Sequence, residues 1–247
     1  SSMSTVTGYK SMIMAAAALP KFVPMIGTAI GATKPAEILV IGAGVVGLQA
    51  IATAKRLGGI VKAVDIRAAA REEAASLGAK IVGFEAPDEF AIGEGGYAGA
   101  LPQEWLLRER EAIAPFVASA GIIVSSALGP GGGAPGPITH ERIASMHAGS
   151  VIVDVAVDQG GNCAATVPAT ETVVHGVNVL GYVNIPGSVP VHSSWLYGKN
   201  MLAFVQNLFK NGAGTPDFED EIVRHTLVTR DGRIVHHGAL HAMGMTD

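Results

Sequence analysis

The sequence predicts an α/β fold built on a doubly wound parallel sheet. Short segments rich in Val and Ile alternate with longer segments of helical periodicity, the order that yields a parallel sheet covered by helices on both faces. Hydrophobic residues form 49% of the chain and charged residues only 15%, as expected when strands are buried on both faces. With 247 residues, the chain can form one large domain or a domain with a smaller partner.

The first half begins with an Ala-rich segment that predicts a helix over residues 6–19. Its apolar run ends at Pro20 and Lys21, short of the roughly 20 apolar residues that span a bilayer, so we expect a soluble chain. A proline-containing loop follows. Strands are then predicted at 37–42, 60–65 and 80–84, and helices at 46–57 and 68–77.

The second half opens on a glycine-rich stretch, residues 93–99, which predicts a mobile surface loop. A long helix over 192–210 carries apolar residues at helical spacing, which indicates a packed face, and a polar tail follows it. Between these segments, helices are predicted at 103–118 and 139–147, and strands at 121–126, 150–156, 171–174 and 177–181.

A Gly-x-Gly-x-x-Gly turn lies between the first predicted strand and its helix, within residues 37–65. Gly42 permits a tight turn, Gly44 lets a pyrophosphate approach the backbone, and Gly47 lets the helix pack close to the sheet. The N–H groups at the start of the helix favour anionic phosphates. This strand, turn and helix predict a nicotinamide or flavin nucleotide site; the alternative is a turn whose glycines serve packing alone.

Asp65 ends the second predicted strand, about 20 residues after Gly44, where such folds place the acid that holds the adenosine ribose hydroxyls. A carboxylate there also repels a ribose 2′-phosphate, so the sequence favours NAD(H) over NADP(H). Arg67 follows two residues later and is interpreted as a surface arginine at the start of the next helix.

Several other site classes are disfavoured. The net charge is −4 and no Lys/Arg run occurs, so nucleic acid is not an expected partner. The single cysteine, Cys163, indicates a reducing compartment and a small, at least half-buried thiol rather than a nucleophile. His237 and His241 have the spacing of two metal ligands on one helix face, but Gly238 and the tail position favour a frayed end, so no metal site is expected.

Two acidic residues follow the predicted strand at 150–156. Asp158 precedes a Gly-Gly pair and is open to three interpretations: a general acid, a contact on the nicotinamide side, or a turn-forming residue. Asp154 is predicted to cap or anchor the end of the strand.

Motifs spread over essentially the whole chain resemble the NAD(H)-binding alpha subunit, the extrinsic component, of proton-translocating NAD(P) transhydrogenase, and more distantly alanine dehydrogenase. The matching stretches are 1–3, 8–10, 47–58, 94–98, 149–154, 160–163, 196–200, 216–223 and 228–232. The resemblance implies a Rossmann-like NAD(H)-binding domain at 9–189. It also implies that residues 1–8 and 190–247 are remnants of a first domain, most of which lies upstream of Ser1.

The resemblance also assigns roles to individual residues. Tyr97 matches the tyrosine of a mobile loop that closes over the nucleotide, with Leu101 in place of the usual methionine. Ser2 matches a serine that orients the nicotinamide carboxamide. The implied nucleotide-binding residues are Gly42, Gly44, Val45, Val46, Gly47, Asp65, Ile66, Arg67, Tyr97, Ala127, Leu128 and Ser2. Asp158 stands where transhydrogenases commonly carry Glu and alanine dehydrogenases carry a catalytic aspartate.

The implied function is hydride transfer from NADH to NADP⁺ held by a membrane-associated partner subunit, coupled to proton translocation. The implied location is the cytoplasmic side of the inner membrane, or the mitochondrial matrix in a eukaryote, and the implied assembly is a homodimer. This chain alone is expected to turn over no substrate. Two alternatives remain: an amino-acid dehydrogenase that uses Asp158, and a truncated NAD-binding module without turnover.

Overall fold

The computed structural model describes residues 1–92, 99, 101–127, 136–212, 214 and 216–245. The chain divides into two compact units, Ser1–Ser193 and Ser194–Asp247. The first unit contains the large sheet, which is described first.

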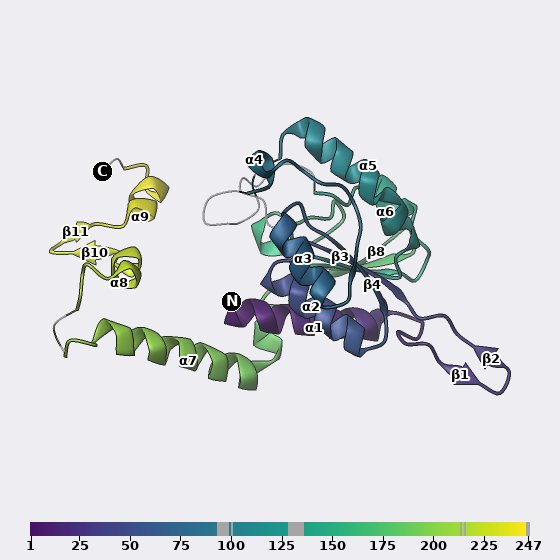
Figure 1. Ribbon diagram of the computed structural model, residues 1–247, viewed down its shortest axis with the longest axis horizontal. Helices are drawn as coiled ribbons and strands as arrows, with labels where there is room; N and C mark the ends of the chain where they lie inside the picture. The colour runs from purple at the N-terminus through teal and green to yellow at the C-terminus, as the bar shows by residue number, and fades with distance from the viewer. Residues whose placement is uncertain (93–98, 100, 128–135, 213, 215, 246–247) are drawn as a thin grey trace. The chain divides into compact units, whose positions relative to one another are not determined.

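The predicted doubly wound α/β sheet is confirmed. Seven strands lie in the order β5-β4-β3-β6-β7-β9-β8. Figure 1 shows this sheet with helices packed around it. The bounds of the strands are β3 Glu37–Ile41, β4 Ile60–Val64, β5 Lys80–Ile81, β6 Ile122–Ser125, β7 Val151–Asp154, β8 Glu171–Val174 and β9 Val177–Leu180. Strand β3 pairs in parallel with β4 on one side and β6 on the other, so the order in which strands are added to the sheet reverses between β3 and β6. In open α/β sheets, ligands bind in the crevice at the carboxyl ends of such strands.

One edge of the sheet departs from the parallel pattern. Strand β8 pairs with β9 in antiparallel fashion. The two residues between them, His175 and Gly176, have φ angles of 51° and 79°. A two-residue connection of this kind can only join antiparallel strands, because a parallel pair needs a long crossover. The sheet is therefore mostly parallel, with β8 as an antiparallel strand at its edge.

Helices cover both faces of the sheet. Residues Ile38 and Val40 of β3 pack toward one face, with α1, α2 and α3. The alternate residues Leu39 and Ile41 pack toward the other face, with α5 and α6. The helix bounds are α1 Ser2–Ala18, α2 Val45–Arg56, α3 Ala68–Ser76, α4 Asp88–Ala91, α5 Gln103–Ser119 and α6 His140–Ala144. The period of two along each strand thus fixes which helix each side chain meets.

Helix α1 lies against α2. It begins at Ser2, earlier than the predicted start at residue 6, and runs without interruption past residue 9. Gly8 marks the closest approach, since a Cβ atom there would lie 2.1 Å from the carbonyl oxygen of Val46. The predicted boundary between residues 8 and 9 therefore falls inside a continuous helix that packs on the sheet.

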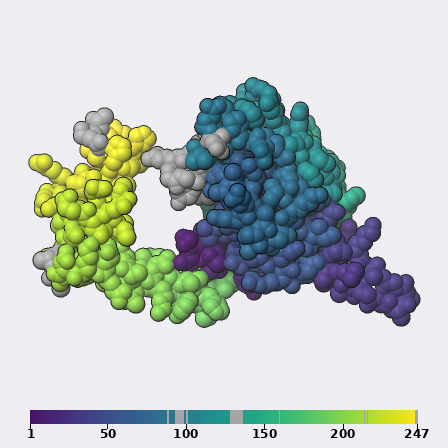
Figure 2. Space-filling model, in the orientation of Figure 1, coloured from purple at the N-terminus to yellow at the C-terminus, as the bar shows by residue number. Residues whose placement is uncertain are grey.

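A small hairpin was not predicted from the sequence, which indicated only a proline-containing loop. Strands β1 (Gly27–Thr28) and β2 (Gly31–Ala32) pair in antiparallel fashion, and every residue from 27 to 32 is exposed. Figure 2 shows this hairpin in purple, projecting from the first unit. Across the described residues, no helix combines the length and the apolar character needed to cross a bilayer.

The second unit contains most of α7 (Pro190–Leu208) and the tail. The tail is more ordered than its polar composition indicated, with α8 Glu221–Thr226, β10 Thr229–Arg230, β11 Arg233–Ile234 and α9 His237–Ala242. Along the apolar face of α7, Trp195, Leu202 and Val205 are exposed, with exposed fractions of 60%, 50% and 47%. Within the described residues, the face predicted to be packed is largely open.

Candidate functional site

The glycine-rich turn joins β3 to α2 at the carboxyl edge of the sheet. Gly42 has a φ of 89°, in the left-handed region that favours glycine. A Cβ atom on Gly42 would lie 2.7 Å from the backbone nitrogen of Ala127, so the turn also touches the end of β6 closely. Ser126 stabilises this contact between the turn and the end of β6, because its hydroxyl donates to the carbonyl oxygen of Gly42 at 3.0 Å. Gly42 is therefore required by the fold.

The other two glycines of the motif differ from each other. A Cβ atom on Gly47 would lie 1.8 Å from the carbonyl oxygen of Gly42, so Gly47 is needed for α2 to pack on the turn. Gly44 has an ordinary φ of −77°. The nearest atom to a Cβ built there is Nη2 of Arg67, 4.0 Å away. The fold thus has no steric need for glycine at position 44, and the space above it suits the close backbone approach of a pyrophosphate.

The N-terminus of α2 faces the same region. Gly44 is the N-cap residue, and Val45 and Val46 form the first turn, with the Val45 side chain 43% exposed. The first N–H groups of a helix have no partner within the helix, and the helix dipole places positive charge there. Together with the open space at Gly44, this end of α2 fits an anionic phosphate group.

Asp65 lies just after β4 and beside the turn. Its side chain is 5% exposed, and its Oδ2 accepts from the backbone N–H of Ala43 at 2.7 Å. Arg67 caps the start of α3 and donates its own backbone N–H to Asp65 Oδ1 at 2.9 Å. The backbone carbonyl of Ile66, between them, accepts from Arg71 Nη1 at 2.9 Å. The carboxylate is therefore held at the turn, where the sequence placed it.

The interpretation of Arg67 as a surface arginine is wrong. Its guanidinium folds back on Asp65, with Nε donating to Oδ1 at 3.1 Å and Nη2 donating to Oδ2 at 2.9 Å. Only 21% of its side chain is exposed. Asp65 in turn raises the pKa of Arg67, because the hydrogen bonds and the negative charge favour the protonated guanidinium. Sequence spacing alone gave no sign of this fork-like contact.

The prediction that Asp154 anchors the end of its strand is confirmed. Asp154 is fully buried. Its Oδ2 accepts from the backbone N–H groups of Asn162 at 2.8 Å and Cys163 at 3.0 Å, and from the hydroxyl of Thr166 at 2.9 Å. Its Oδ1 accepts from the N–H of Ala156 at 3.2 Å. These bonds fix the loop that follows β7.

That loop borders a pocket of about 480 Å³ at the carboxyl edge of the sheet. Asp158, in the short 3-10 helix Val157–Gln159, is exposed and lines the pocket. Val46 links the pocket to the start of α2. Its lining comprises Met3, Ser4, Thr7, Val46, Ser126, Val155, Ala156, Asp158, Tyr182, Val183, Asn184, Ile185 and Pro186. Ser2 and Ala127 are not among these described lining residues.

Sequence reasoning missed five polar residues of this lining: Ser4 and Thr7 of α1, and three that lie after strands β6 and β9. Ser126 immediately follows β6, where the strand order of the sheet reverses, and this position was a usable signal. Asn184 has a φ of 49° and precedes the 3-10 helix Ile185–Ser188. Tyr182 donates its hydroxyl to Glu171, and burial, together with the Glu171 carboxylate, raises the pKa of Tyr182 to about 12. The last two are positioned by the β9 end of the sheet, where the sequence indicated only short apolar strands.

Some features predicted from the sequence fall on residues that the structure does not describe. Tyr97 and Leu128 lie outside the described residues, as does most of the predicted mobile loop at 93–99. Ala127 is described, and its carbonyl oxygen accepts from Asn162 Nδ2 at 2.8 Å, which ties the end of β6 to the loop after β7.

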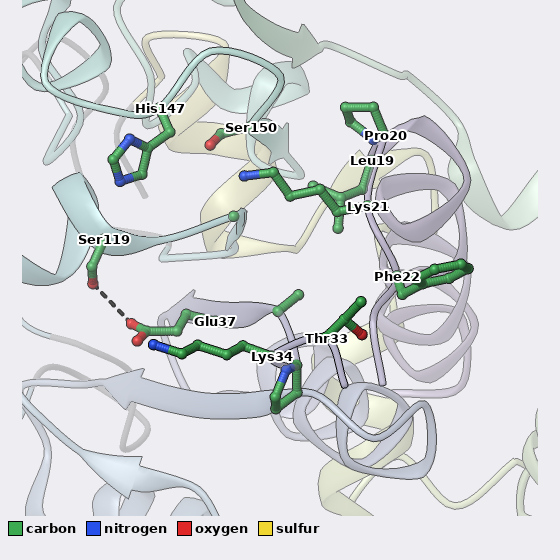
Figure 3. Close-up of a pocket in the computed structure, with 13 residues that line it drawn as sticks. Leu19, Pro20, Lys21, Phe22, Thr33, Lys34, Glu37, Ser119, His147 and Ser150 are labelled. Carbon is green, nitrogen blue, oxygen red and sulfur yellow. Dashed lines mark hydrogen bonds between the residues drawn. The ribbon is translucent and has the colours of Figure 1, made fainter. Parts of the chain in front are cut away.

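A larger pocket, of about 700 Å³, lies at the opposite, amino edge of the sheet (Figure 3). Glu37 begins β3 and Ser150 precedes β7, and both line this pocket. Glu37 Oε2 accepts from Lys62 Nζ at 2.6 Å and from Ser119 at 2.9 Å. The bond to Lys62 lowers the pKa of Glu37. Since ligands of open α/β sheets bind at the carboxyl edge, size alone does not make this pocket the nucleotide site.

The histidines and the cysteine show no metal or nucleophile arrangement among the described residues. Burial raises the pKa of the Cys163 thiol, which is only 6% exposed, and this agrees with the predicted inert, buried thiol. His236 caps α9, since its Nδ1 accepts from the N–H of Ala239 at 3.1 Å. No group of three or more His, Cys, Asp or Glu side chains with a geometry for metal occurs in the described part of the chain.

Glu109 is a titratable group of the site region that the sequence did not single out. It lies on α5 and is partly buried. Burial, aided by the negative charge of Asp65, raises the pKa of Glu109 to about 7, and Arg110 opposes this effect.

We expect the Glu109 carboxyl to make stability depend on pH. Its pKa in the folded chain is above the ordinary value of 4.5, so its stabilising contribution is complete below about pH 4.5 and is lost as pH rises through about 7. The Glu109→Gln variant should be about 1–2 kcal/mol more stable than wild type at pH 8 and show no such gain at pH 4.5. Urea denaturation at both pH values measures this, with Glu111→Gln as the control for charge loss on the same helix; equal gains in both variants would contradict it.

The chain is similar to transhydrogenase subunits and, at lower identity, to alanine dehydrogenases. The profile of the family described as alanine dehydrogenase/PNT, C-terminal domain, matches residues 11–237. The chain is 43% identical over 241 residues to the first part of NAD(P) transhydrogenase subunit alpha of Rhodospirillum rubrum, covering 96% of this chain and 62% of the relative. It is 29% identical over 250 residues to alanine dehydrogenase of Halomonas elongata, covering 98% of this chain and 62% of the relative.

A solved structure agrees with these relatives. The transhydrogenase of Sinorhizobium meliloti superposes with a TM-score of 0.79 at 38% identity, covering 95% of this chain and 62% of the other. The chain therefore spans less than two thirds of the length of the proteins that it matches.

Proposed function

The chain belongs to the alanine dehydrogenase/PNT C-terminal domain family, and on that premise we propose that residues 9–189 bind NAD(H) and present its nicotinamide for hydride transfer. The acceptor is NADP⁺ held by a separate, membrane-associated subunit, and the transfer is coupled to proton translocation. The proposal follows the transhydrogenase relatives, which are more similar to this chain than the alanine dehydrogenase is.

The observation that carries the proposal is the difference among the three glycines of the turn. Gly42 and Gly47 are explained by packing, whereas Gly44 has open space at its Cα and no steric reason to be glycine. A ligand that must approach the backbone closely supplies the reason. The pyrophosphate of a dinucleotide at the start of α2, with its adenosine ribose at Asp65, accounts for both features.

The bound dinucleotide would supply the hydride chemistry. The chain holds its adenine half at Gly44, Val45 and Asp65, and the pocket bordered by Ser126 and Asp158 receives the nicotinamide half. No side chain need take or give a proton in this transfer, so position and exclusion of water are the protein's contributions. Closure by the segment around Tyr97 belongs to the same proposal.

The remaining assignments follow from the part of the relatives that this chain covers. Residues 190–247 belong with a first domain that completes the site, and residues 1–8, although related to that domain, begin α1 and pack with the sheet. The subunit lies on the cytoplasmic side of the inner membrane, or in the mitochondrial matrix. The exposed apolar side chains of α7 suit a homodimer.

Binding of NADH should be tighter than binding of NADPH. Asp65 accepts hydrogen bonds from the ribose hydroxyls and opposes a 2′-phosphate at the same place. Asp65→Ala should weaken NADH binding by about 1–3 kcal/mol and reduce the difference in affinity between NADH and NADPH. Titration of NADH and NADPH fluorescence measures both affinities, with Glu72→Ala, an exposed acid on α3, as control. Equal or tighter binding of NADPH by the wild-type chain would contradict the assignment.

Hydride transfer should need the remaining parts of the enzyme. The chain alone should show no turnover, and activity should appear when it is combined with the first domain and the NADP(H)-binding subunit of a relative. Misplacement of the nicotinamide by about 1 Å is enough to cost roughly a hundredfold in rate. Reduction of an NAD⁺ analogue by NADPH, followed by absorbance, measures this.

A second candidate function rests on Asp158, which is exposed and lines the pocket. An alanine-dehydrogenase-like reaction would use it as an acid during amination of a keto acid. Formation of alanine from pyruvate, ammonia and NADH by the chain, lost in Asp158→Asn, would replace the transhydrogenase proposal. NADH binding without either activity in the combined system would leave an NAD-binding module.

A further inference from the structure

The carboxylate of Asp65 has a full set of hydrogen-bond donors without any ligand. A carboxylate has about four acceptor positions, two on each oxygen. Backbone N–H groups take two of them, from Arg67 to Oδ1 at 2.9 Å and from Ala43 to Oδ2 at 2.7 Å. The guanidinium of Arg67 takes the other two, through Nε to Oδ1 at 3.1 Å and Nη2 to Oδ2 at 2.9 Å.

The two guanidinium donors lie where the proposed function places the ribose. The backbone donors belong to the turn and to the start of α3, so they remain as long as the fold does. The guanidinium is the replaceable part. It also faces the turn, because Nη2 is 4.0 Å from a Cβ built on Gly44. A ribose diol likewise offers two hydroxyl donors, one for each carboxylate oxygen.

We propose that Arg67 is an internal competitor for the ribose position: its guanidinium fork is exchanged for the two ribose hydroxyls when a dinucleotide binds. This inference rests on the proposed NAD(H) function and goes beyond it, since Arg67 then opposes binding of an unmodified ribose. The exchange keeps the number of donors on Asp65 unchanged. It removes the ion pair of a carboxylate that is only 5% exposed.

The same exchange changes nucleotide preference. While Arg67 is paired with Asp65, the two charges cancel at the ribose position, so the repulsion of a 2′-phosphate is weaker than Asp65 alone would produce. Once displaced, the guanidinium remains nearby, and a guanidinium is the side chain best suited to a phosphate. Arg67 therefore disfavours NAD(H) and tolerates NADP(H).

The test compares two arginines of the same segment. Arg67→Met removes the fork and keeps an apolar stem. Arg71→Gln is the matched control, because Arg71 Nη1 donates to the backbone carbonyls of Asp65 at 3.3 Å and Ile66 at 2.9 Å and not to the carboxylate. Dissociation constants for ADP-ribose and its 2′-phosphate derivative are measured by calorimetry for both variants and wild type. Thermal melting without nucleotide shows that each variant is folded.

We expect Arg67→Met to bind ADP-ribose roughly three- to tenfold more tightly than wild type does. The same variant should bind the 2′-phosphate derivative more weakly than wild type does. Arg71→Gln should leave both dissociation constants unchanged. In ¹⁵N NMR of the wild-type chain, the Arg67 Nε–H signal should shift and exchange faster at saturating ADP-ribose. Unchanged or weaker binding of ADP-ribose by folded Arg67→Met overturns the inference, as does an Nε–H signal that stays protected. If the wild-type chain binds no ADP-ribose, the proposed function fails and this inference with it.

Should Arg67→Met not fold, Arg67→Lys provides the same comparison. It keeps the charge but cannot form the two-pronged contact. It should bind ADP-ribose more tightly than wild type by a smaller factor, and weaker binding overturns the inference.

Discussion

Gly44→Ala is expected to weaken NADH binding by roughly a hundredfold while lowering the stability of the free chain by less than about 1 kcal/mol, the cost of replacing an N-cap glycine. The added methyl group has room in the absence of nucleotide, with the nearest atom, Arg67 Nη2, 4.0 Å away, and φ is an ordinary −77°. With nucleotide, it occupies the path of the pyrophosphate. Loss of two charge-assisted hydrogen bonds of about 1.5 kcal/mol each gives this factor. Fluorescence titration and thermal melting measure the two quantities separately.

The matched control is Gly47→Ala in the same turn. Its methyl group would lie 1.8 Å from the carbonyl oxygen of Gly42, so the backbone must shift and the folded chain should lose several kcal/mol. If Gly44→Ala also lowered the melting temperature strongly, Gly44 would be a packing residue. Unaffected NADH binding in Gly44→Ala would remove the main support for the nucleotide site.

Asp154→Ala is expected to cost about 3–5 kcal/mol of stability. The side chain is fully buried and accepts hydrogen bonds from the backbone of Asn162 and Cys163 and from the hydroxyl of Thr166. Each buried donor left without a partner costs about 1–3 kcal/mol. Urea denaturation followed by circular dichroism measures the change.

Asp158→Ala is the control for this prediction, because it removes an exposed carboxylate from the same loop. Its effect on stability should stay within about 0.5 kcal/mol. A loss of less than about 1 kcal/mol in Asp154→Ala would mean that the loop re-forms without its anchor.

The central part of the fold could be predicted closely from the sequence. The predicted ranges agree with strand β3, helix α2 and strand β4 to within one residue at each end. Apolar runs, glycines and Asp65 mark these boundaries in the sequence. The edge strand β8 and the hairpin at residues 27–32 were harder. Their short segments carry little periodicity, and a two-residue turn at His175 reverses the chain without a Gly or Asn at its first position.

The site could be predicted to a lesser extent. The sequence indicated the turn and its acid, because both depend on residues close along the chain. It missed Ser126 and Tyr182, which reach the pocket from separate strands, and it misassigned Arg67. An ion pair between residues two positions apart depends on how the guanidinium folds, and chain spacing does not encode that direction.

The reversal of strand order between β3 and β6 also has a kinetic consequence. Ile38 pairs with Ile122, so this contact closes the longest loop among the parallel pairs of the sheet, whereas β8 and β9 meet through a two-residue turn. Closing a longer loop costs more entropy, and pairings distant in sequence form late in folding. We therefore expect the hairpin at the edge to form early, and the crevice that would hold the nucleotide to be among the last regions of the sheet to assemble.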